Sequence, residues 1–228
     1  MARGKSLHFY LAGINNQNFL MRDRETGSWW QQVTGHAISG PLEGETLELV
    51  ANDELSFGLW KTEAPRALVL EPVPGHDKDY DGDWEKEVAR LPVTVSFPGQ
   101  GLKDRDVVLG VEAGGATRAF PLQRVLAQSP VEDKMNGVPI VLVLGPDGKS
   151  VRVFRAALNN SEIELYRDQQ NKQWQLVDGR GNTWNFQGCA VSGPATGQCL
   201  EQVRYLKDYW FDWRNYHPLT TVAGQRPS

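Results

Sequence analysis

The chain has few of the residues that build metal and thiol sites. Its 228 residues include only two cysteines and four histidines. The histidines are not spaced i, i+4, the spacing that would place two ligands on one face of a helix. No Gly-x-Ser-x-Gly, phosphate-loop or dinucleotide-binding motif occurs. The sequence therefore predicts no cofactor. The histidines are His8, His36, His76 and His217.

Long apolar runs and basic runs are absent as well. No stretch of about 18 apolar residues occurs, so the sequence predicts no membrane-spanning helix. The first residues, Met-Ala-Arg-Gly-Lys-Ser, lack the apolar core of a signal peptide. The net charge of −4 and the pI of about 5.6 argue against nucleic-acid binding. An apolar content of 40% and a charged content of 23% are ordinary for a soluble globular protein.

What the chain does contain is an internal repeat. Gly40-Pro41 recurs as Gly193-Pro194, 153 positions later, and the same offset relates Trp60 to Trp213 and Pro65 to Pro218. A long shared offset with matched Gly, Pro and Trp residues indicates a tandem duplication. We expect the matched residues to serve the repeated scaffold. In the first copy they are Asp23, Trp30, Gly40, Pro41 and Trp60, and in the second Asp178, Trp184, Gly193, Pro194 and Trp213.

The local pattern predicts a fold of the α+β class, mainly β, made of two tandem pseudo-repeat units, each with a short helix at its end. The first unit spans residues 1–70, a connector rich in proline and acidic residues spans 71–106, and the second unit spans 107–228. The front part of the second unit, 107–155, has no counterpart in the first. Strands are expected at 7–14, 19–23, 28–33, 45–50, 107–111, 117–120, 138–144, 151–154, 163–166, 173–178 and 183–186, and helices at 54–63, 84–90, 121–127 and 207–216.

Two cysteines flank the second Gly-Pro loop. Cys189 and Cys199 allow three interpretations: a redox pair, a disulfide that staples the loop, or two unrelated buried thiols. Their first-copy equivalents are His36 and Thr46, so the repeated scaffold does not require sulfur. The sequence leaves the three possibilities open.

Acidic residues form the remaining candidate sites. Asp77, Asp79, Asp81 and Asp83 alternate as in a calcium loop, but the twelfth position holds Val88 instead of the bidentate Glu. The alternative interpretation is an acidic, solvated linker. The repeated Asp23 and Asp178 are expected to cap turns through their side chains rather than to transfer protons.

The first copy also carries a family resemblance. Residues 23–38 contain Asp-Arg-x-Thr-x-Ser-Trp-Trp-Gln-Gln-x-Thr-Gly-x-Ala-Ile, followed by Gly-Pro-Leu-x-Gly. In the second unit, Arg-Ala-Phe-Pro-Leu at 118–122 and Gly-Val-Pro-Ile at 137–140 fit the front segment of the same pattern. Together these motifs resemble the bacterial family called domain of unknown function 3179, and the resemblance covers most of the chain.

The resemblance implies a thiol or selenol chemistry whose residues this chain lacks. The family's candidate reactive motif is Cys-Pro-Leu-Cys, and some relatives carry selenocysteine there. Its gapless match in the second unit is Gly145, Pro146, Asp147 and Gly148, and a histidine usual upstream aligns with Gln128. The second unit is thus expected to be a degenerate copy. In the first unit the motif would fall just before Met1.

Two functional hypotheses follow. The first is that the chain is the remainder of an extracytoplasmic redox protein, read from an internal start at Met1; an authentic start would predict a cytoplasmic protein. The second is a non-enzymatic scaffold or accessory subunit that binds a protein partner, or a second copy of itself, through an open sheet edge near residues 7–11. Aromatic anchors would be Trp29, Trp60, Trp84 and Trp210.

Overall fold

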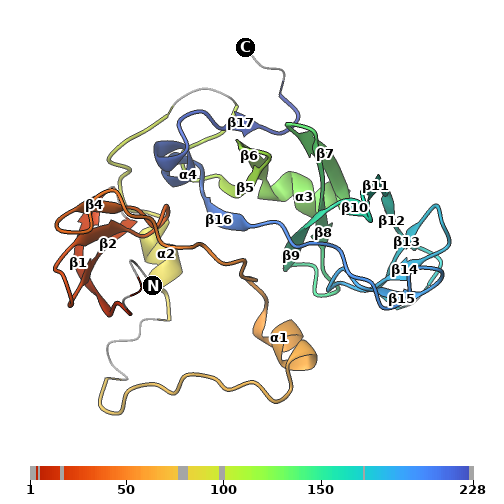
Figure 1. Cartoon of the computed structure of the whole chain (residues 1–228), viewed down its shortest axis with the longest axis horizontal. Helices are drawn as coiled ribbons and strands as arrows, with labels where there is room; N and C mark the ends of the chain where they lie inside the picture. The colour runs from red at the N-terminus through yellow and green to blue at the C-terminus, as the bar shows by residue number, and fades with distance from the viewer. Residues whose placement is uncertain are drawn as a thin grey trace.

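The computed structural model describes residues 4, 6–15, 18–76, 82–97, 101–171 and 173–225. Across these residues the chain is mainly β, with short helices and several small sheets (Figure 1). The expected α+β, mainly β class is therefore confirmed. None of the helices in the described residues combines the length and apolar character that a membrane crossing requires.

The first unit contains one small antiparallel sheet in the order β1-β2-β3-β4. Met21 on β2 pairs with Trp30 on β3, and Trp30 pairs in turn with Ala37 on β4. Within the described residues its buried core consists of Trp30, Ala37 and Leu42, with partly buried apolar side chains packed around them. The strands are β1 (Phe9–Asn15), β2 (Asn18–Asp23), β3 (Trp29–Gln31) and β4 (Ala37–Ser39).

The strand expected at 45–50 does not form. Thr46 makes an isolated bridge to His36, but the following residues have no strand partner among the described residues. Leu49 and Val50 are exposed there. The alternating pattern was present, yet a strand also needs a neighbour to receive its backbone hydrogen bonds.

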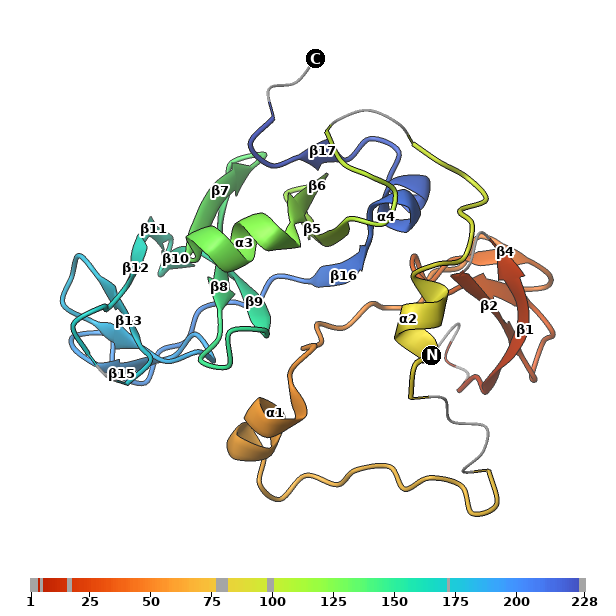
Figure 2. The ribbon, with the colours of Figure 1, turned by 180° about the vertical axis from the view of Figure 1, so that it is seen from behind.

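Helix α1 (Phe57–Glu63) follows, and it does not pack on the sheet of its own unit. Ser56 caps the start of the helix by accepting a hydrogen bond from the Leu59 backbone N–H. Ala64 is the C-cap residue, directly before Pro65. Leu55 and Leu59 pack against the hydrophobic cluster of the second unit. Figures 1 and 2 show α1 well away from β1–β4, at the start of a long extended segment that leads to α2 (Trp84–Val88).

The second unit is built around a sheet in the order β16-β5-β6-β17. The short last strand, β17, runs parallel to β6, whereas the other pairs are antiparallel. Helix α4 covers this sheet through Trp210 and Trp213. The elements are β5 (Val107–Ala113), β6 (Ala116–Pro121), α3 (Leu122–Gln128), β16 (Tyr205–Tyr209), α4 (Trp210–Tyr216) and β17 (Thr221–Val222).

The helix expected at 207–216 was too long by three residues. Lys207 pairs with Leu109 and Tyr209 with Val107, so residues 207–209 belong to strand β16. Pairing with β5 satisfies their backbone groups, and tertiary context thereby overrides the local helical pattern.

A second sheet of three strands, β7-β8-β9, completes the main core. The apolar run at 138–144 forms β8, as expected, and its middle residues are buried. The sequence pattern did not indicate β7, whose residues are largely charged. The strands are β7 (Val131–Met135), β8 (Val138–Leu144) and β9 (Val151–Arg155).

The small sheet of the second unit repeats that of the first. Its order is β12-β13-β14-β15, and Leu176 pairs with Trp184, which pairs with Ala190. These residues stand where Met21, Trp30 and Ala37 stand in the first sheet. The remaining strands are β10 (Ala157–Leu158), β11 (Ser161–Glu162), β12 (Leu165–Arg167), β13 (Leu176–Asp178), β14 (Thr183–Trp184) and β15 (Ala190–Ser192).

Candidate functional site

The repeated aspartates are structural turn residues in this fold. The Asp23 side chain accepts hydrogen bonds from the backbone N–H of Thr26 and from the indole N–H of Trp30, at 2.5 and 2.8 Å. Burial acts to raise the pKa of Asp23, but these hydrogen bonds outweigh it and lower the pKa. The Asp178 side chain likewise accepts hydrogen bonds from the backbone N–H of Asn182 and the indole N–H of Trp184, at 3.0 and 3.1 Å. The pKa of Asp178 is also lowered.

Each Gly-Pro loop closes over the turn that the aspartate organises. The backbone N–H of Leu42 donates to Ser28 Oγ in the first copy, and that of Ala195 donates to Asn182 Oδ1 in the second. A Cβ atom at Gly193 would lie 2.5 Å from a backbone oxygen, and its φ of 93° is itself unfavourable for other residues. The loops therefore need glycine for close approach, and nothing in this geometry presents a reactive group.

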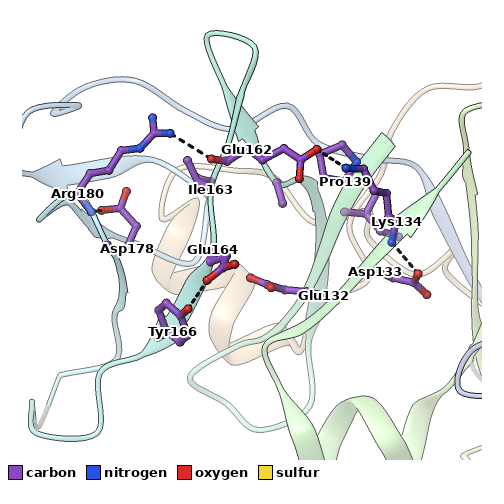
Figure 3. Close-up of a pocket in the computed structure, with 13 residues that line it drawn as sticks. Glu132, Asp133, Lys134, Pro139, Glu162, Ile163, Glu164, Tyr166, Asp178 and Arg180 are labelled. Carbon is purple, nitrogen blue, oxygen red and sulfur yellow. Dashed lines mark hydrogen bonds and ion pairs between the residues drawn. The ribbon is translucent and has the colours of Figure 1, made fainter. Parts of the chain in front are cut away.

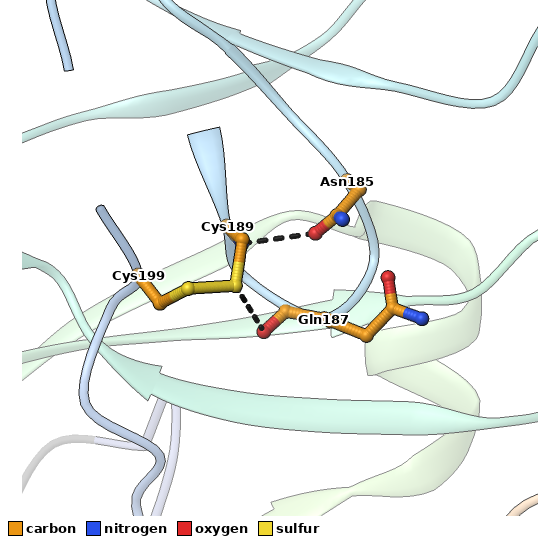
Figure 4. The surroundings of a disulfide bond; sticks show 4 residues. All are labelled: Asn185, Gln187, Cys189 and Cys199. Carbon is orange, nitrogen blue, oxygen red and sulfur yellow. Dashed lines mark hydrogen bonds between the residues drawn. A yellow bond between two sulfur atoms is a disulfide. The ribbon is translucent and has the colours of Figure 1, made fainter. Parts of the chain in front are cut away.

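Cys189 and Cys199 form a disulfide, one of the three possibilities that the sequence left open (Figure 4). They lie opposite each other at an isolated bridge between the two ends of the Gly-Pro loop. In the first copy the same bridge joins His36 to Thr46, whose hydroxyl hydrogen-bonds His36 Nδ1 at 2.8 Å. A covalent bond and a hydrogen bond thus close equivalent loops.

Gly145 to Gly148 form the tight turn between β8 and β9. The Asp147 carboxylate accepts hydrogen bonds from the backbone N–H and the hydroxyl of Ser150. Burial opposes ionisation of Asp147, but hydrogen bonds from Ser150 and Ser56 lower its pKa to about 2. Ser56, at the start of α1, also donates its backbone N–H to Ser150 Oγ. The four positions Gly145 to Gly148 are thus occupied by a turn that Ser56 contacts through Ser150, and Pro146 and Gly148 are exposed.

The calcium candidate cannot be placed. Asp77, Asp79 and Asp81 lie outside the described residues, and Asp83 stands at their edge, where its side chain pairs with Lys86. No group of three or more His, Cys, Asp or Glu side chains suited to a metal ion occurs within the part of the chain that the structure describes.

A polar cavity of about 550 Å³ lies between β7 and β12 (Figure 3). Glu162 pairs with Lys134, and its backbone oxygen accepts a hydrogen bond from Arg180. Tyr166 donates its hydroxyl to Glu164, and this bond raises the pKa of Tyr166. Most of these polar groups already have partners within the chain.

A buried carboxyl pair lies in a cleft of about 280 Å³ between the first sheet and the β16–α4 junction. Asp208 lines this cleft, and Asn18 of the first sheet donates to Asp212 Oδ2 at 2.7 Å. Burial, followed by the charge of Asp212, raises the pKa of Asp208; burial also raises that of Asp212. His217 and Glu112 line the same cleft, 3.5 Å apart. Both carboxyl groups therefore favour the protonated form more than a solvated aspartate does.

Sequence analysis missed this cleft. The one local signal was the spacing of four residues between Asp208 and Asp212, and it becomes a contact only because a strand passes directly into a helix there. Asn18 is 194 positions away from Asp212 in the sequence. No local pattern could have joined them.

Arg152 ties the two units together on the other side of the molecule. It is 5% exposed and forms ion pairs with Asp53 at 2.6 Å and Glu63 at 2.8 Å. Its guanidinium also stacks over Phe186, 4.6 Å from the ring centroid. These contacts hold α1 against β9. They also explain why Trp60 lies half-buried beside the second unit, whereas its equivalent Trp213 is buried on the sheet of its own unit.

Comparison with known proteins gives one match. The family described as "Protein of unknown function (DUF3179)" matches residues 2–220. No curated protein and no solved structure matches the chain significantly.

Proposed function

Since the chain belongs to the DUF3179 family, whose description specifies no activity, we propose that it acts as a non-catalytic scaffold or accessory subunit that binds a protein partner through its first unit. The proposal rests on where the apolar surface lies. It needs no reaction from the chain itself.

The supporting observation is the uneven exposure of large apolar side chains. Among the described residues that follow Gly101 in the sequence, the exposed large apolar side chains are only Tyr166, Val191, Leu206 and Leu219. The larger number precede Gly101, in the first unit and the connector, where the small sheet buries Trp30, Ala37 and Leu42. Exposed apolar side chains that adjoin one another, as Leu11 and Ile14 do on one strand, are typical of interaction surfaces. They are Tyr10, Leu11, Ile14, Phe19, Ile38, Leu49, Val50, Phe57, Leu68, Val69, Leu70, Val73, Trp84, Leu91 and Val95.

The edge strand β1 gives this surface a backbone component. It lies at the end of the order β1-β2-β3-β4, so one of its sides has no neighbouring strand in this sheet. Leu11 and Ile14 on this strand are 59% and 67% exposed. An edge strand with exposed apolar side chains can receive an extended segment of a partner.

The proposal is tested by comparing two double variants as bait proteins in extracts of the producing cells. Leu11→Lys with Ile14→Lys should abolish recovery of a specific partner that the unmodified chain retains. The matched control, Tyr166→Lys with Val191→Lys, places the same charges on exposed apolar positions of the second unit and should retain it. Equal recovery by both double variants would contradict binding through the first unit.

A redox role is the second candidate. The resemblance to relatives with a Cys-Pro-Leu-Cys motif supports an extracytoplasmic thiol or selenol protein, and in this chain Cys189 and Cys199, its two cysteines, would form the pair that cycles between dithiol and disulfide. A disulfide between Cys189 and Cys199 also suits an oxidising compartment. In such a reaction an external dithiol would reduce a disulfide, with two electrons and two protons passing to its sulfurs.

The two candidates are separated by an insulin-reduction assay with dithiothreitol as the reductant. A scaffold should be as inactive as its Cys189→Ser, Cys199→Ser double variant. Turnover that depends on the two cysteines would contradict the scaffold proposal and assign the chemistry to this disulfide.

A further inference from the structure

Helix α1 repeats helix α4 in its backbone detail. Both helices have seven residues, and the residue after each has nearly the same conformation, with φ and ψ of −127° and 62° at Ala64 and −125° and 68° at His217. The backbone N–H of Ala64 donates to Trp60 O at 2.8 Å, and that of His217 donates to Trp213 O at 2.9 Å. The two helices end in the same way.

The turn after each helix is repeated as well. The backbone N–H of Ala67 donates to Ala64 O at 3.0 Å, and that of Thr220 donates to His217 O at 2.9 Å. A proline follows the helix end in both copies. Residues 68–69 therefore correspond to Thr221–Val222, which form strand β17.

In the second unit this helix–turn–strand element is held by the β5–β6 hairpin. Trp213 is 1% exposed and lies directly on Gly110 of β5, where a Cβ atom would come within 2.2 Å of the indole ring. Strand β17 pairs parallel with β6, and β16, just before α4, pairs antiparallel with β5. The hairpin thus contacts the element along its whole length.

In the first unit the same element has no hairpin among the described residues. Phe57 is 63% exposed, whereas its equivalent Trp210 is 1% exposed. Val69 and Leu70 are 59% and 95% exposed, while their equivalents Val222 and Ala223 are 6% and 7% exposed. The cavity beside Trp60 measures about 650 Å³, against about 280 Å³ beside Trp213, where Glu112 of β5 forms part of the wall.

We propose that residues 52–70, the docking element, bind an antiparallel β-hairpin of a partner protein, with a glycine of the hairpin facing Trp60. This inference rests on the proposed role in binding a protein partner and names the structure that the partner contributes. Residues 52–56 would pair antiparallel with the first strand of the hairpin, as β16 pairs with β5. Residues 68–70 would add a parallel strand to its other side, as β17 does for β6.

A second copy of this chain is a poorer occupant than a separate protein. The only hairpin of the required kind in the described residues is β5–β6, and Trp213 already covers its Gly110. A second copy could offer it only by releasing its own α4, whose Trp210, Phe211 and Trp213 are each 1% exposed. Loss of that burial would oppose the exchange.

The chain's own hairpin sequence provides the probe. A peptide of residues 106–122, closed by a disulfide between added terminal cysteines, should bind the full-length chain with a Kd of about 10–100 µM, because closure reduces the entropy lost on binding. A peptide with Gly110→Leu should bind at least about tenfold more weakly, since the added side chain would meet the indole ring. Hydrogen exchange at residues 68–70 should slow when the first peptide is present.

Variants of the chain decide whether the peptide occupies the docking element. Trp60→Ala should weaken binding at least about tenfold. The matched control Tyr166→Ala removes an exposed aromatic side chain outside the docking element and should leave binding unchanged. Leu68→Asp with Leu70→Asp, at fully exposed positions that leave folding intact, should also weaken it. Binding that survives both Trp60→Ala and this double variant, equal binding of the two peptides, or no binding at 1 mM peptide would overturn the proposal.

Analytical sedimentation of the chain alone tests whether a second copy of the chain occupies the docking element. Self-association that Trp60→Ala abolishes would show that a second copy fills the site and would overturn the choice of a separate protein. The bait experiment with Leu11 and Ile14 is independent of residues 52–70. A peptide that fails to bind while that experiment succeeds would therefore reject the hairpin and leave the proposed function standing.

Discussion

Equivalent residues of the repeat, such as Trp60 and Trp213, have different surroundings in the two units. Trp213 lies under a sheet, stacks on His217 at 3.6 Å and donates its indole N–H to Thr220 Oγ1 at 2.9 Å. Trp60 has Ala64 and Ala67 at the corresponding positions, so neither contact can form. Burial at these positions is set by the neighbouring strands and not by the helix that carries the tryptophan.

Trp213→Ala should accordingly destabilise the protein far more than Trp60→Ala. Removal of a fully buried indole should cost about 3–5 kcal/mol in the free energy of unfolding. Trp60→Ala should cost roughly 1–2 kcal/mol, because its ring is only half-buried. Urea denaturation of both variants measures the difference. Equal losses would show that Trp60 is as well packed as Trp213.

The carboxyl pair should make stability depend on pH. Burial raises the pKa values of Asp208 and Asp212 in the folded state, and the charge of Asp212 raises that of Asp208 further. These carboxyl groups therefore hold protons in the folded protein at pH values above about 4, where the unfolded chain has lost them. The contribution of the pair is therefore complete below about pH 4 and is lost as the pH rises through the raised pKa.

Asp212→Asn should remove this loss. The variant should gain on the order of 1–2 kcal/mol over the unmodified chain at pH 8 and little at pH 4, as judged by urea denaturation at both pH values. Asp168→Asn is the matched control. Hydrogen bonds from Gln175 and Gln170 lower the pKa of Asp168, so its replacement should cost stability at pH 8 and not at low pH. A variant of Asp212 that loses stability at pH 8 would contradict the raised pKa values of the pair.

At the scale of elements, the two small sheets show how one loop is closed by different chemistry. The bridge between the ends of the Gly-Pro loop is a disulfide in the second unit and a hydrogen bond between His36 and Thr46 in the first. The backbone bonds around it agree in both: Leu47 donates to Gly35 O, and Leu200 donates to Gly188 O, each at 2.9 Å. The backbone hydrogen bonds thus determine the conformation of the loop, and the disulfide only adds stability to it.

Removal of the disulfide should lower stability without changing the loop. Cys189 and Cys199 are separated by 10 positions, and cross-linking so short a loop contributes about 2–3 kcal/mol by the chain-entropy estimate. The Cys189→Ser, Cys199→Ser variant should lose that amount in urea denaturation and keep the chemical shifts of the Asp178 turn. His36→Ala, the control in the first unit, should lose about 1 kcal/mol or less. A disulfide-free chain with a rearranged turn would show that sulfur is needed for the loop.

At the scale of the whole molecule, contacts between distant parts of the sequence hold the units together. Arg152 hydrogen-bonds Asp53 and Glu63, which are 99 and 89 positions away in the sequence. Asn18 likewise hydrogen-bonds Asp212. Glu54 and Lys207, which occupy equivalent positions in the two copies, also form an ion pair. A contact between equivalent positions indicates that the two helix-bearing segments approach each other with approximate two-fold symmetry.

Arg152→Met should loosen α1 from the second unit. The loss should be about 2–3 kcal/mol, below that of a fully buried ion pair, because Asp53 and Glu63 keep 26% and 15% exposure and can be hydrated. Trypsin should then cleave after Lys61 several-fold faster. Arg155→Met is the control, since the Arg155–Glu201 pair is largely exposed, and it should not change the rate. An unchanged rate in Arg152→Met would mean that Leu55 and Leu59 alone hold the helix.

The sequence by itself determined what is local. The matched Asp, Trp, Gly and Pro residues located both Gly-Pro loops, because the hydrogen bonds that build them, such as Trp30 to Asp23, join residues within about 20 positions of each other. The apolar run of β8 likewise predicted a buried strand. Only the tertiary structure decided where α1 packs, that residues 207–209 are strand, and that Asp212 is buried and bonded to Asn18. Each of these depends on a backbone or side-chain partner about 90 or more positions away, and a local pattern records a residue's own preferences but not which distant surface will satisfy them.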